Sequence, residues 1–300
     1  MSGRRRVAAL LAAAALTGTL TGCTAAAGDS AGIQIVASTD VYAAIAEQLA
    51  VGLPPGRVGV SAIIGDPSID PHSYEASARN ELAISRADLI IENGGGYDDF
   101  VDMLRDAAGA DAQVINAVSL SGHAQDAEFN EHVWYDFPTV ERVGRRITAF
   151  LLGHDKVDAA IVRRNAARFA ADLRELEATE ARIRHVHAGE GVAITEPVPA
   201  YLLAACGLAN RTPVEFSKAI EDGTDASPRV LQDTVDLFTA HQVKLLVYNE
   251  QTAGPQTDQL ISAAKDNDVP VVAVTETLPA SIGYPQWMRG ILRDVAAALS

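Results

Sequence analysis

The chain has 300 residues, of which 24 are Lys or Arg and 39 are Asp or Glu, so its formal net charge is −15. Such an acidic protein repels nucleic acids and anionic membrane surfaces and attracts cations, which excludes functions that depend on a basic surface. Its hydrophobic content of 48% and its length are sufficient for two lobes, each with its own core.

The N-terminal segment has the composition of an export signal. Three consecutive arginines precede an apolar run that is too short to span a bilayer, and residues 20–23 read Leu-Thr-Gly-Cys. These four residues are similar to a bacterial lipobox, whose cysteine becomes the lipid-modified first residue of the mature protein. We therefore predict a signal peptide at 1–22, lipidation of Cys23 and a flexible tether at 23–32. The alternative is an ordinary signal peptide with an incidental cysteine.

The second cysteine, Cys206, lies in a helix-like run that is rich in leucine. If Cys23 carries a lipid, Cys206 has no partner within the chain for a disulfide. We therefore predict that Cys206 is a small core residue and not a reactive thiol.

Residues 33–156 alternate between strand-like and helix-like segments, which predicts an α/β lobe with a parallel sheet and helices on both faces. Asp40 is the candidate N-cap of the first helix. The predicted strands are 33–38, 58–64, 87–92 and 113–116, and the predicted helices are 41–51, 77–85 and 97–107.

A glycine-rich turn at residues 93–96 joins a predicted strand to a predicted helix, as a phosphate-binding loop would. However, the turn lacks the Lys and the Ser or Thr that such loops use, and Asp98 and Asp99 follow it directly. We therefore predict a tight turn without a phosphate site.

The longest helical pattern in the chain follows this lobe, and no Gly or Pro interrupts it between 157 and 187. We predict a rigid linking helix there, between an N-terminal lobe at 33–156 and a C-terminal α/β lobe at 188–300. The fold class is therefore α/β, with two lobes that contain parallel sheets, one long rigid helix that joins them, and a ligand site in the cleft between them. In the second lobe the predicted strands are 192–195, 243–248 and 269–274, and the predicted helices are 198–206, 233–240, 257–265 and 287–299.

Four residues of types that bind metals fall at the carboxyl ends of predicted strands, the edge where open α/β sheets bind ligands. His72 follows the second strand on a loop stiffened by two prolines, and His132 follows the fourth strand after a short polar loop. Glu196 directly follows the first strand of the second lobe, and Glu276 lies at the end of its last strand. Two imidazoles and two carboxylates balance a +2 ion and suit Zn²⁺ or Mn²⁺ better than Ca²⁺ or Mg²⁺.

Two histidine motifs also carry a family resemblance. Residues 70–75 read Asp-Pro-His-Ser-Tyr-Glu, and residues 132–134 read His-Val-Trp. Together with the lipobox and the long helix, they resemble the metal-binding lipoproteins of bacterial zinc and manganese ABC importers, from the lipobox to the C-terminus. The resemblance implies one metal ion held between two α/β lobes by His72, His132, Glu196 and Glu276.

The chain departs from the typical family pattern in four places. Glu131 replaces the Pro that often precedes the second ligand, and only His123 stands where zinc members carry a long His-rich loop. The third ligand is His in typical zinc members and Glu in typical manganese members, and this chain has Glu196. Glu276 is one methylene longer than the usual Asp. The pattern therefore does not decide whether the metal is zinc or manganese. If Glu196 is not the third ligand, Asp40 and Glu250 are the next candidates.

We accordingly expect a solute-binding protein that captures zinc or manganese outside the cytoplasm and delivers it to the permease of an ABC importer. We expect a monomer that is lipid-anchored to the cell membrane, at the cell surface or in the periplasm, with no nucleic-acid partner and no catalytic activity. One alternative is a metal-dependent hydrolase, which would need an open coordination position and a general base. Another is a binder of a metal chelate such as a siderophore, which shares the stiff helix but would need a wide cleft without the histidine pair.

Overall fold

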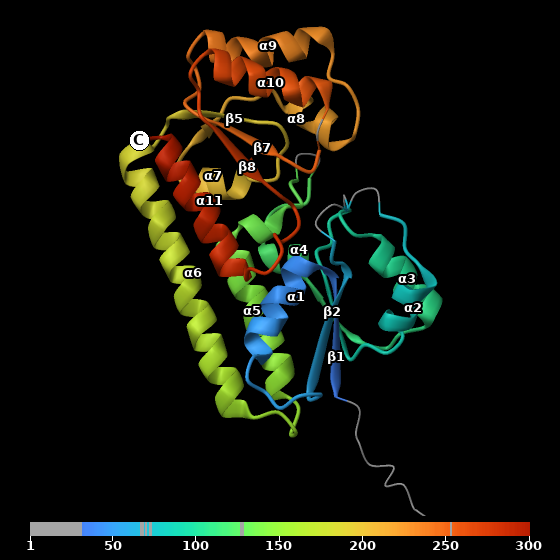
Figure 1. Cartoon of the computed structure of the whole chain (residues 1–300). Coiled ribbons are helices and arrows are strands. Elements are labelled where there is room, and N and C mark those ends of the chain that lie inside the picture. The colour runs from blue at the N-terminus through green and yellow to red at the C-terminus, as the bar shows by residue number, and fades with distance from the viewer. Residues whose placement is uncertain (1–31, 67–68, 70, 72–73, 127–128, 253) are drawn as a thin grey trace, which may run out of the picture. The chain divides into compact units, whose positions relative to one another are not determined.

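The computed structural model of the chain is shown in Figure 1. The predicted signal peptide, the lipidation site Cys23 and the predicted ligand His72 lie outside the described residues. The structure describes residues 32–66, 69, 71, 74–126, 129–252 and 254–300.

The first sheet has four parallel strands in the order β2-β1-β3-β4. Ile35 at the centre of β1 lies beside Val60 of β2 and Leu89 of β3, so apolar residues line the middle of the sheet. The predicted parallel sheet of this lobe is confirmed. Its strands are β1 Ile33–Thr39, β2 Val58–Ile64, β3 Leu89–Glu92 and β4 Gln113–Asn116, and its helices are α1 Asp40–Ala50, α2 Ala78–Ile84, α3 Phe100–Ala108 and α4 Ala117–Ser121.

The second sheet is also parallel, in the order β6-β5-β7-β8. Counted along the chain, its strands follow the same order as those of the first sheet, so the two lobes repeat one topology. The strands are β5 Gly191–Ile194, β6 Ala209–Asn210, β7 Leu246–Asn249 and β8 Val271–Val274, and the helices are α7 Ala200–Ala205, α8 Val214–Glu221, α9 Pro228–Thr239, α10 Pro255–Asp266 and α11 Tyr284–Ala298.

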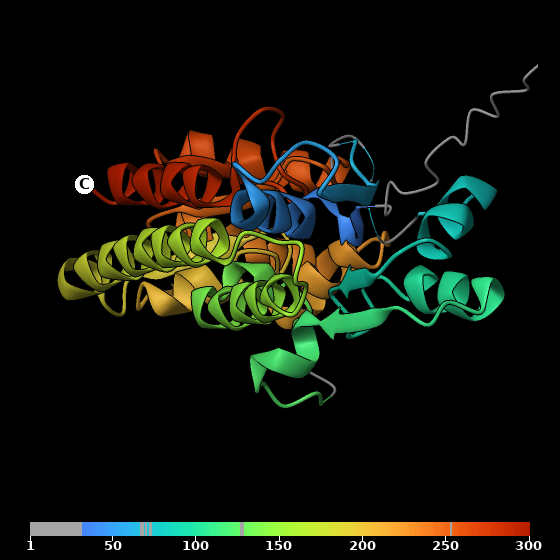
Figure 2. The same cartoon turned by 90° about the horizontal axis from the view of Figure 1, so that it is seen from below.

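The predicted long helix is confirmed as α6, Ala159–His187, which has 29 residues. Asp158 caps it, because its Oδ1 accepts hydrogen bonds from the backbone N–H groups of Ala160 and Ile161. The helix packs against α1 and α5 (Phe137–Leu152) on the side of the first sheet and against α7 and α11 on the side of the second. Figure 2 shows α1, α5, α6 and α11 running side by side.

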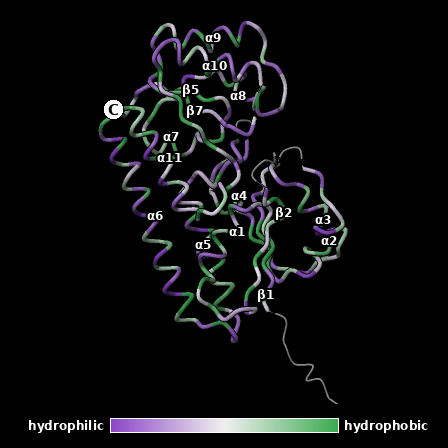
Figure 3. Tube along the Cα trace, viewed as in Figure 1, coloured by the Kyte–Doolittle hydropathy of each residue, from purple (hydrophilic) through white to green (hydrophobic). Residues whose placement is uncertain are grey.

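One hydrophobic core connects the two lobes. The same cluster of buried side chains includes Ile35 of the first sheet, Val192 of the second, and Leu173 and Leu176 of α6. Many residues within β1 and β2 are hydrophobic, whereas much of α6 is hydrophilic (Figure 3). A shared core of this kind stabilises both sheets together.

The glycine-rich turn is a tight turn, as predicted. Gly94, Gly95 and Gly96 all have positive φ angles, a conformation that glycine adopts at little cost. The carboxylate of Asp98 accepts hydrogen bonds from the backbone N–H groups of Asn93 (2.6 Å) and Gly94 (2.7 Å). An acidic side chain therefore occupies the place where a phosphate would have to bind.

The expectation that Asp40 caps α1 is wrong. Thr39 is the N-cap residue, and Asp40 is the first residue of the helix. The Oδ1 atom of Asp40 instead accepts a hydrogen bond of 3.0 Å from the backbone N–H of Leu278. The local sequence assigns this side chain to the start of the helix, but in the fold it binds a backbone N–H that is 238 residues away along the chain.

Within the part of the chain that the structure describes, no helix combines the length and the apolar character needed to cross a membrane.

Candidate metal centre

Three buried polar residues meet at the carboxyl end of the second sheet. Glu196 follows β5, Asn249 is the last residue of β7, and Glu276 follows β8. The parallel strands bring these residues together because all three strands end at the same edge. Their exposed fractions are only 1–2%.

The amide of Asn249 links the two carboxylates. Its Nδ2 donates to Oε2 of Glu196 (2.6 Å) and to Oε1 of Glu276 (2.8 Å). The backbone N–H of Gln251 donates to Oδ1 of Asn249 at 3.1 Å, and this donor can be satisfied only by an oxygen. The orientation of the amide is therefore settled by its hydrogen bonds, and its NH₂ group faces the carboxylates.

Further groups surround Glu276. The side-chain oxygen Oε1 of Gln251 accepts a hydrogen bond from the backbone N–H of Glu276 at 2.6 Å. Tyr97, which follows the glycine turn of the first lobe, is also next to this carboxylate. Burial raises the pKa of Tyr97 well above its usual value, and the negative charge of Glu276 raises it further. The tyrosine is therefore a neutral hydroxyl at neutral pH.

His132 joins this group from the other lobe. Its side chain is fully buried, and its Nε2 lies 3.9 Å from Oε2 of Glu276. Its Nδ1 lies 2.7 Å from Oδ1 of Asn130, an oxygen that also accepts the backbone N–H of His132. Since Asn130 Oδ1 can only accept, a proton is on Nδ1, and in the neutral imidazole the lone pair is on Nε2, the ring nitrogen beside Glu276. This is the tautomer that a metal ligand requires, held by a neighbouring acceptor.

Hydrogen bonds fasten the segment around His132 to the second lobe. Asn130 takes part in two of them: its Nδ2 donates to the carbonyl of Pro197 (3.0 Å), and its carbonyl accepts from the hydroxyl of Tyr201 (2.7 Å). The hydroxyl of Tyr135 donates to the carbonyl of Thr275, the residue before Glu276, at 2.8 Å. The structure thus brings three of the four predicted ligands together: His132, Glu196 and Glu276.

A second acidic group faces the opposite side of the imidazole. Ligand atoms of Glu131, His132 and Glu221 lie within 4.8 Å of one another, and Oε1 of Glu221 is 3.8 Å from Nδ1 of His132. Burial, and then the negative charge of Glu131, raise the pKa of Glu221 to about 8. Because Nδ1 is engaged by Asn130, this side of the ring offers no lone pair to a metal. Glu221 therefore belongs to the surroundings of His132.

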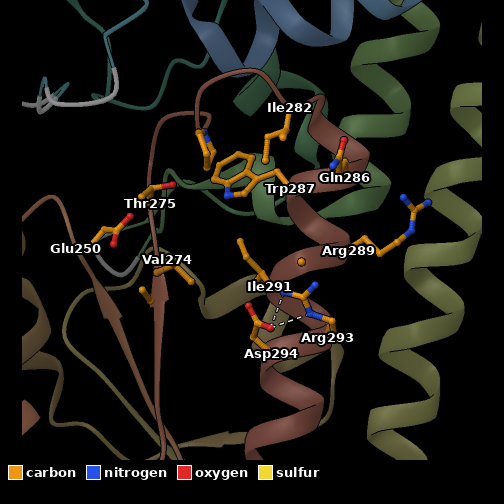
Figure 4. Close-up of a pocket in the computed structure, with 13 residues that line it drawn as sticks. Glu250, Val274, Thr275, Ile282, Gln286, Trp287, Arg289, Ile291, Arg293 and Asp294 are labelled. Carbon is orange, nitrogen blue, oxygen red and sulfur yellow. Dashed lines mark hydrogen bonds and ion pairs between the residues drawn. The ribbon is translucent and has the colours of Figure 1, made fainter.

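Sequence reasoning missed Asn249 and Glu221. Asn249 ends a strand at the same edge as the predicted ligands, and that position was the only signal for it. Glu221 ends α8, an element that was not predicted. Glu250, a predicted alternative ligand, is exposed and lines a pocket of roughly 640 Å³ beside Trp287 of α11. Figure 4 shows it at this pocket, beside Thr275.

Comparison with known proteins places the chain in a family. Residues 35–298 match the family model of the zinc-uptake complex component A, periplasmic. The chain belongs to this family. This member of the zinc-uptake component A family is also similar to the manganese-binding lipoprotein MntA of Bacillus subtilis (strain 168). The two sequences are 26% identical over 262 residues, and the match covers 82% of this chain and 81% of that protein.

Solved structures have the same fold as this family member. A crystal structure of ZnuA matches with a TM-score of 0.72 and 20% identity, over 90% of this chain and 100% of the other. The periplasmic zinc-binding protein TroA from Treponema pallidum matches with a TM-score of 0.72 and 18% identity, over 90% and 99%. The Mn-bound periplasmic metal-binding protein from Candidatus Liberibacter asiaticus matches with a TM-score of 0.71 and 17% identity, over 89% and 100%.

Proposed function

We propose that this member of the zinc-uptake component A family is the extracytoplasmic solute-binding component of an ABC importer, with zinc or manganese as its cargo. The observation that carries the proposal is the meeting of a fully buried His132 with two buried carboxylates, Glu196 and Glu276, at the carboxyl end of one sheet. The comparisons support the same cargo, since the relatives include a manganese-binding lipoprotein and a zinc-binding protein.

The chemistry of the site agrees with a divalent transition metal. Two carboxylates buried next to each other repel one another and lose their hydration, and a +2 ion between them removes both penalties. Nε2 of His132 adds the nitrogen donor that zinc and manganese accept more readily than calcium or magnesium does. We propose His132, Glu196 and Glu276 as ligands, with His72 as the fourth on the basis of the sequence motif. Capture and release of cargo by these four residues involves no bond-breaking chemistry.

We further propose that the protein acts as a monomer held at the membrane by a lipid on Cys23. The lipobox-like residues 20–23 support the anchor, and a lipoprotein is among the relatives. A tether at 23–32 would let the folded body reach a permease in the same membrane.

Removal of proposed ligands tests the function. His132→Ala and Glu276→Ala should each weaken zinc binding by at least roughly tenfold, the loss typical of a disturbed metal site. Affinity is measured by competition with a chromophoric chelator at fixed pH, because both donor types must be deprotonated to bind. Zinc should also raise the melting temperature of the wild type, since a ligand bound only to the folded state stabilises it.

His185→Ala is the matched control, because His185 is exposed at the end of α6. This variant should retain wild-type affinity and the full melting shift. The double variant His72→Ala, His132→Ala should lose both. If the double variant binds zinc as tightly as the wild type, the proposed site is wrong.

A further inference from the structure

Asn249 lies between the two proposed carboxylate ligands, but its Oδ1 is engaged by the backbone N–H of Gln251 and its NH₂ group offers no lone pair to a metal. It ends β7, the strand between β5 and β8, and it is 1% exposed. Glu196 follows one neighbouring strand and Glu276 follows the other. Asn249 therefore occupies the one strand end from which a single side chain reaches both carboxylates.

We infer that Asn249 is a positioning residue that makes each carboxylate a one-oxygen ligand and so biases the site towards zinc over manganese. The inference rests on the proposed function. The NH₂ group of Asn249 donates to Oε2 of Glu196 at 2.6 Å and to Oε1 of Glu276 at 2.8 Å. Each of these buried, charge-assisted hydrogen bonds uses a lone pair of one carboxylate oxygen, so a metal ion that took both oxygens of either carboxylate would compete with the amide for that oxygen.

The amide cannot easily turn away from this task. The backbone N–H of Asn249 donates to Oγ1 of Thr195 at 3.0 Å, and its Oδ1 accepts from the backbone N–H of Gln251 at 3.1 Å. Gln251 in turn holds the backbone N–H of Glu276 at 2.6 Å. These hydrogen bonds hold the amide of Asn249, and they also hold the backbone at Glu276. Outer contacts of this kind orient the ligands of a metal site.

The number of available oxygens matters for the choice of metal. Zinc is satisfied by four donors in a tetrahedron, whereas manganese suits carboxylate, carbonyl and water oxygens in larger shells. If Glu196 and Glu276 each supply one oxygen, the protein contributes two carboxylate oxygens instead of four. The restriction costs manganese more than it costs zinc.

Two variants test this role. Asn249→Leu has a similar volume but donates no hydrogen bond, and Asn249→Asp keeps the shape and replaces the donor by an acceptor. Both release the two carboxylate oxygens, so both should narrow the zinc-over-manganese affinity ratio by roughly tenfold, on the scale of losing an outer partner of a metal ligand. X-ray absorption of the manganese-loaded Asn249→Leu variant, whose new side chain adds no donor atom, should show more oxygen neighbours than in the wild type.

Asn165→Leu is the matched control. Asn165 is also a buried asparagine, but its Nδ2 donates to the carbonyls of Leu49 (3.0 Å) and Val51 (2.7 Å), at the end of α1, and to no proposed ligand. This variant should melt at a lower temperature than the wild type but keep the wild-type affinity ratio and coordination number. If Asn249 had only a structural role, its variants would behave like this control, with a lower melting temperature and an unchanged affinity ratio and coordination number.

A folded Asn249 variant with an unchanged affinity ratio and an unchanged coordination number would overturn the inference. Independently of any variant, a crystal structure of the zinc-loaded wild type should retain both Asn249 hydrogen bonds and one bound oxygen per carboxylate, and a bidentate carboxylate there would also overturn it. Wild-type protein that binds neither metal would instead refute the proposed function, and with it the basis of this inference.

Discussion

Hydrogen-bond partners determine the tautomer and the orientation of single side chains at this site. Asn130 sets the tautomer of His132, with Nδ1 as the donor at 2.7 Å, and Asn249 holds the orientation of Glu196. Such outer partners decide which atom a ligand presents to a metal. We therefore expect the metal preference of the proposed site to depend on a few short contacts and to change with single substitutions.

Glu196→His should widen the zinc-over-manganese affinity ratio. An imidazole is a softer donor than a carboxylate, and zinc, which lies above manganese in the Irving–Williams order, gains more from the exchange. We expect a change of roughly tenfold, the usual scale for a single altered group at a metal site. Competition titrations of both metals at one pH measure it. Glu250→His adds an imidazole at an exposed position and should leave the ratio unchanged; equal ratios in all three proteins would place Glu196 outside the metal shell.

At the scale of elements, α6 contains a buried carboxyl group that the proposed function does not use. Glu180 is 5% exposed, although the other Asp, Glu, Lys and Arg residues of this helix are exposed or half-buried. Burial, and then the negative charge of Glu177, raise its pKa from 4.5 to about 8. The same helix face borders Cys206, and burial together with Glu180 raises the pKa of that thiol to about 12. Cys206 is therefore a protonated core residue, as predicted.

Glu180→Gln should stabilise the metal-free protein at pH 8 but not at pH 4.5. Between pH 4.5 and about 8 the folded state binds a proton at Glu180 that the unfolded state has released, so stability falls as pH rises through this window. Glutamine removes this loss, and we expect a gain of at least about 1 kcal/mol in the free energy of unfolding at pH 8. Urea unfolding at several pH values measures it.

The control is Glu175→Gln, on the same helix. The side chain of Glu175 is 71% exposed, and its ion pair with Arg289 lies at the surface, where such pairs contribute little. The free energy of unfolding of this variant should stay within about 0.5 kcal/mol of the wild type at each pH. A wild-type pH profile that Glu180→Gln does not flatten would contradict the assignment of the slope to Glu180.

At the scale of the whole molecule, residues 32–300 behave as one compact unit that contains both sheets. The shared core through α6 and the hydrogen bonds from the His132 segment to the second lobe connect the lobes at several points. Large separations of the lobes would expose this core. Cargo exchange is therefore expected to involve small displacements at the site.

Cys23→Ser should move the protein out of the membrane fraction. Lipid attachment requires the thiol, and without an acyl anchor an acidic protein of this kind has little attraction for an anionic membrane. We expect most of the wild type in the membrane fraction and most of the variant in the soluble fraction or as uncleaved precursor. Fractionation and the mass of the N-terminal peptide provide the measurement. Cys206→Ser should fractionate like the wild type, and a wild-type N-terminus without acyl mass would refute the anchor.

Local signals in the sequence were sufficient for the layout of the fold and for the types of residue at the site. Apolar runs marked strands such as β3, β5 and β7, because a strand that is largely buried on both faces is apolar along most of its length. An uninterrupted helical pattern marked α6. Ligand-type residues after predicted strands marked Glu196 and Glu276, and His132 followed a strand after a polar loop. These features depend on the residues of one segment at a time, so a single sequence reveals them.

Only the tertiary structure decided which groups act together. The two-residue strand β6 and helix α8 exist through packing against their neighbours, and their sequences were too short or too weakly patterned to predict them. The contact between Asp40 and Leu278 and the Asn249 bridge join residues from distant parts of the chain. Such contacts form because the chain folds the ends of separate strands to one edge, and no local pattern of residues encodes which donor meets which acceptor there.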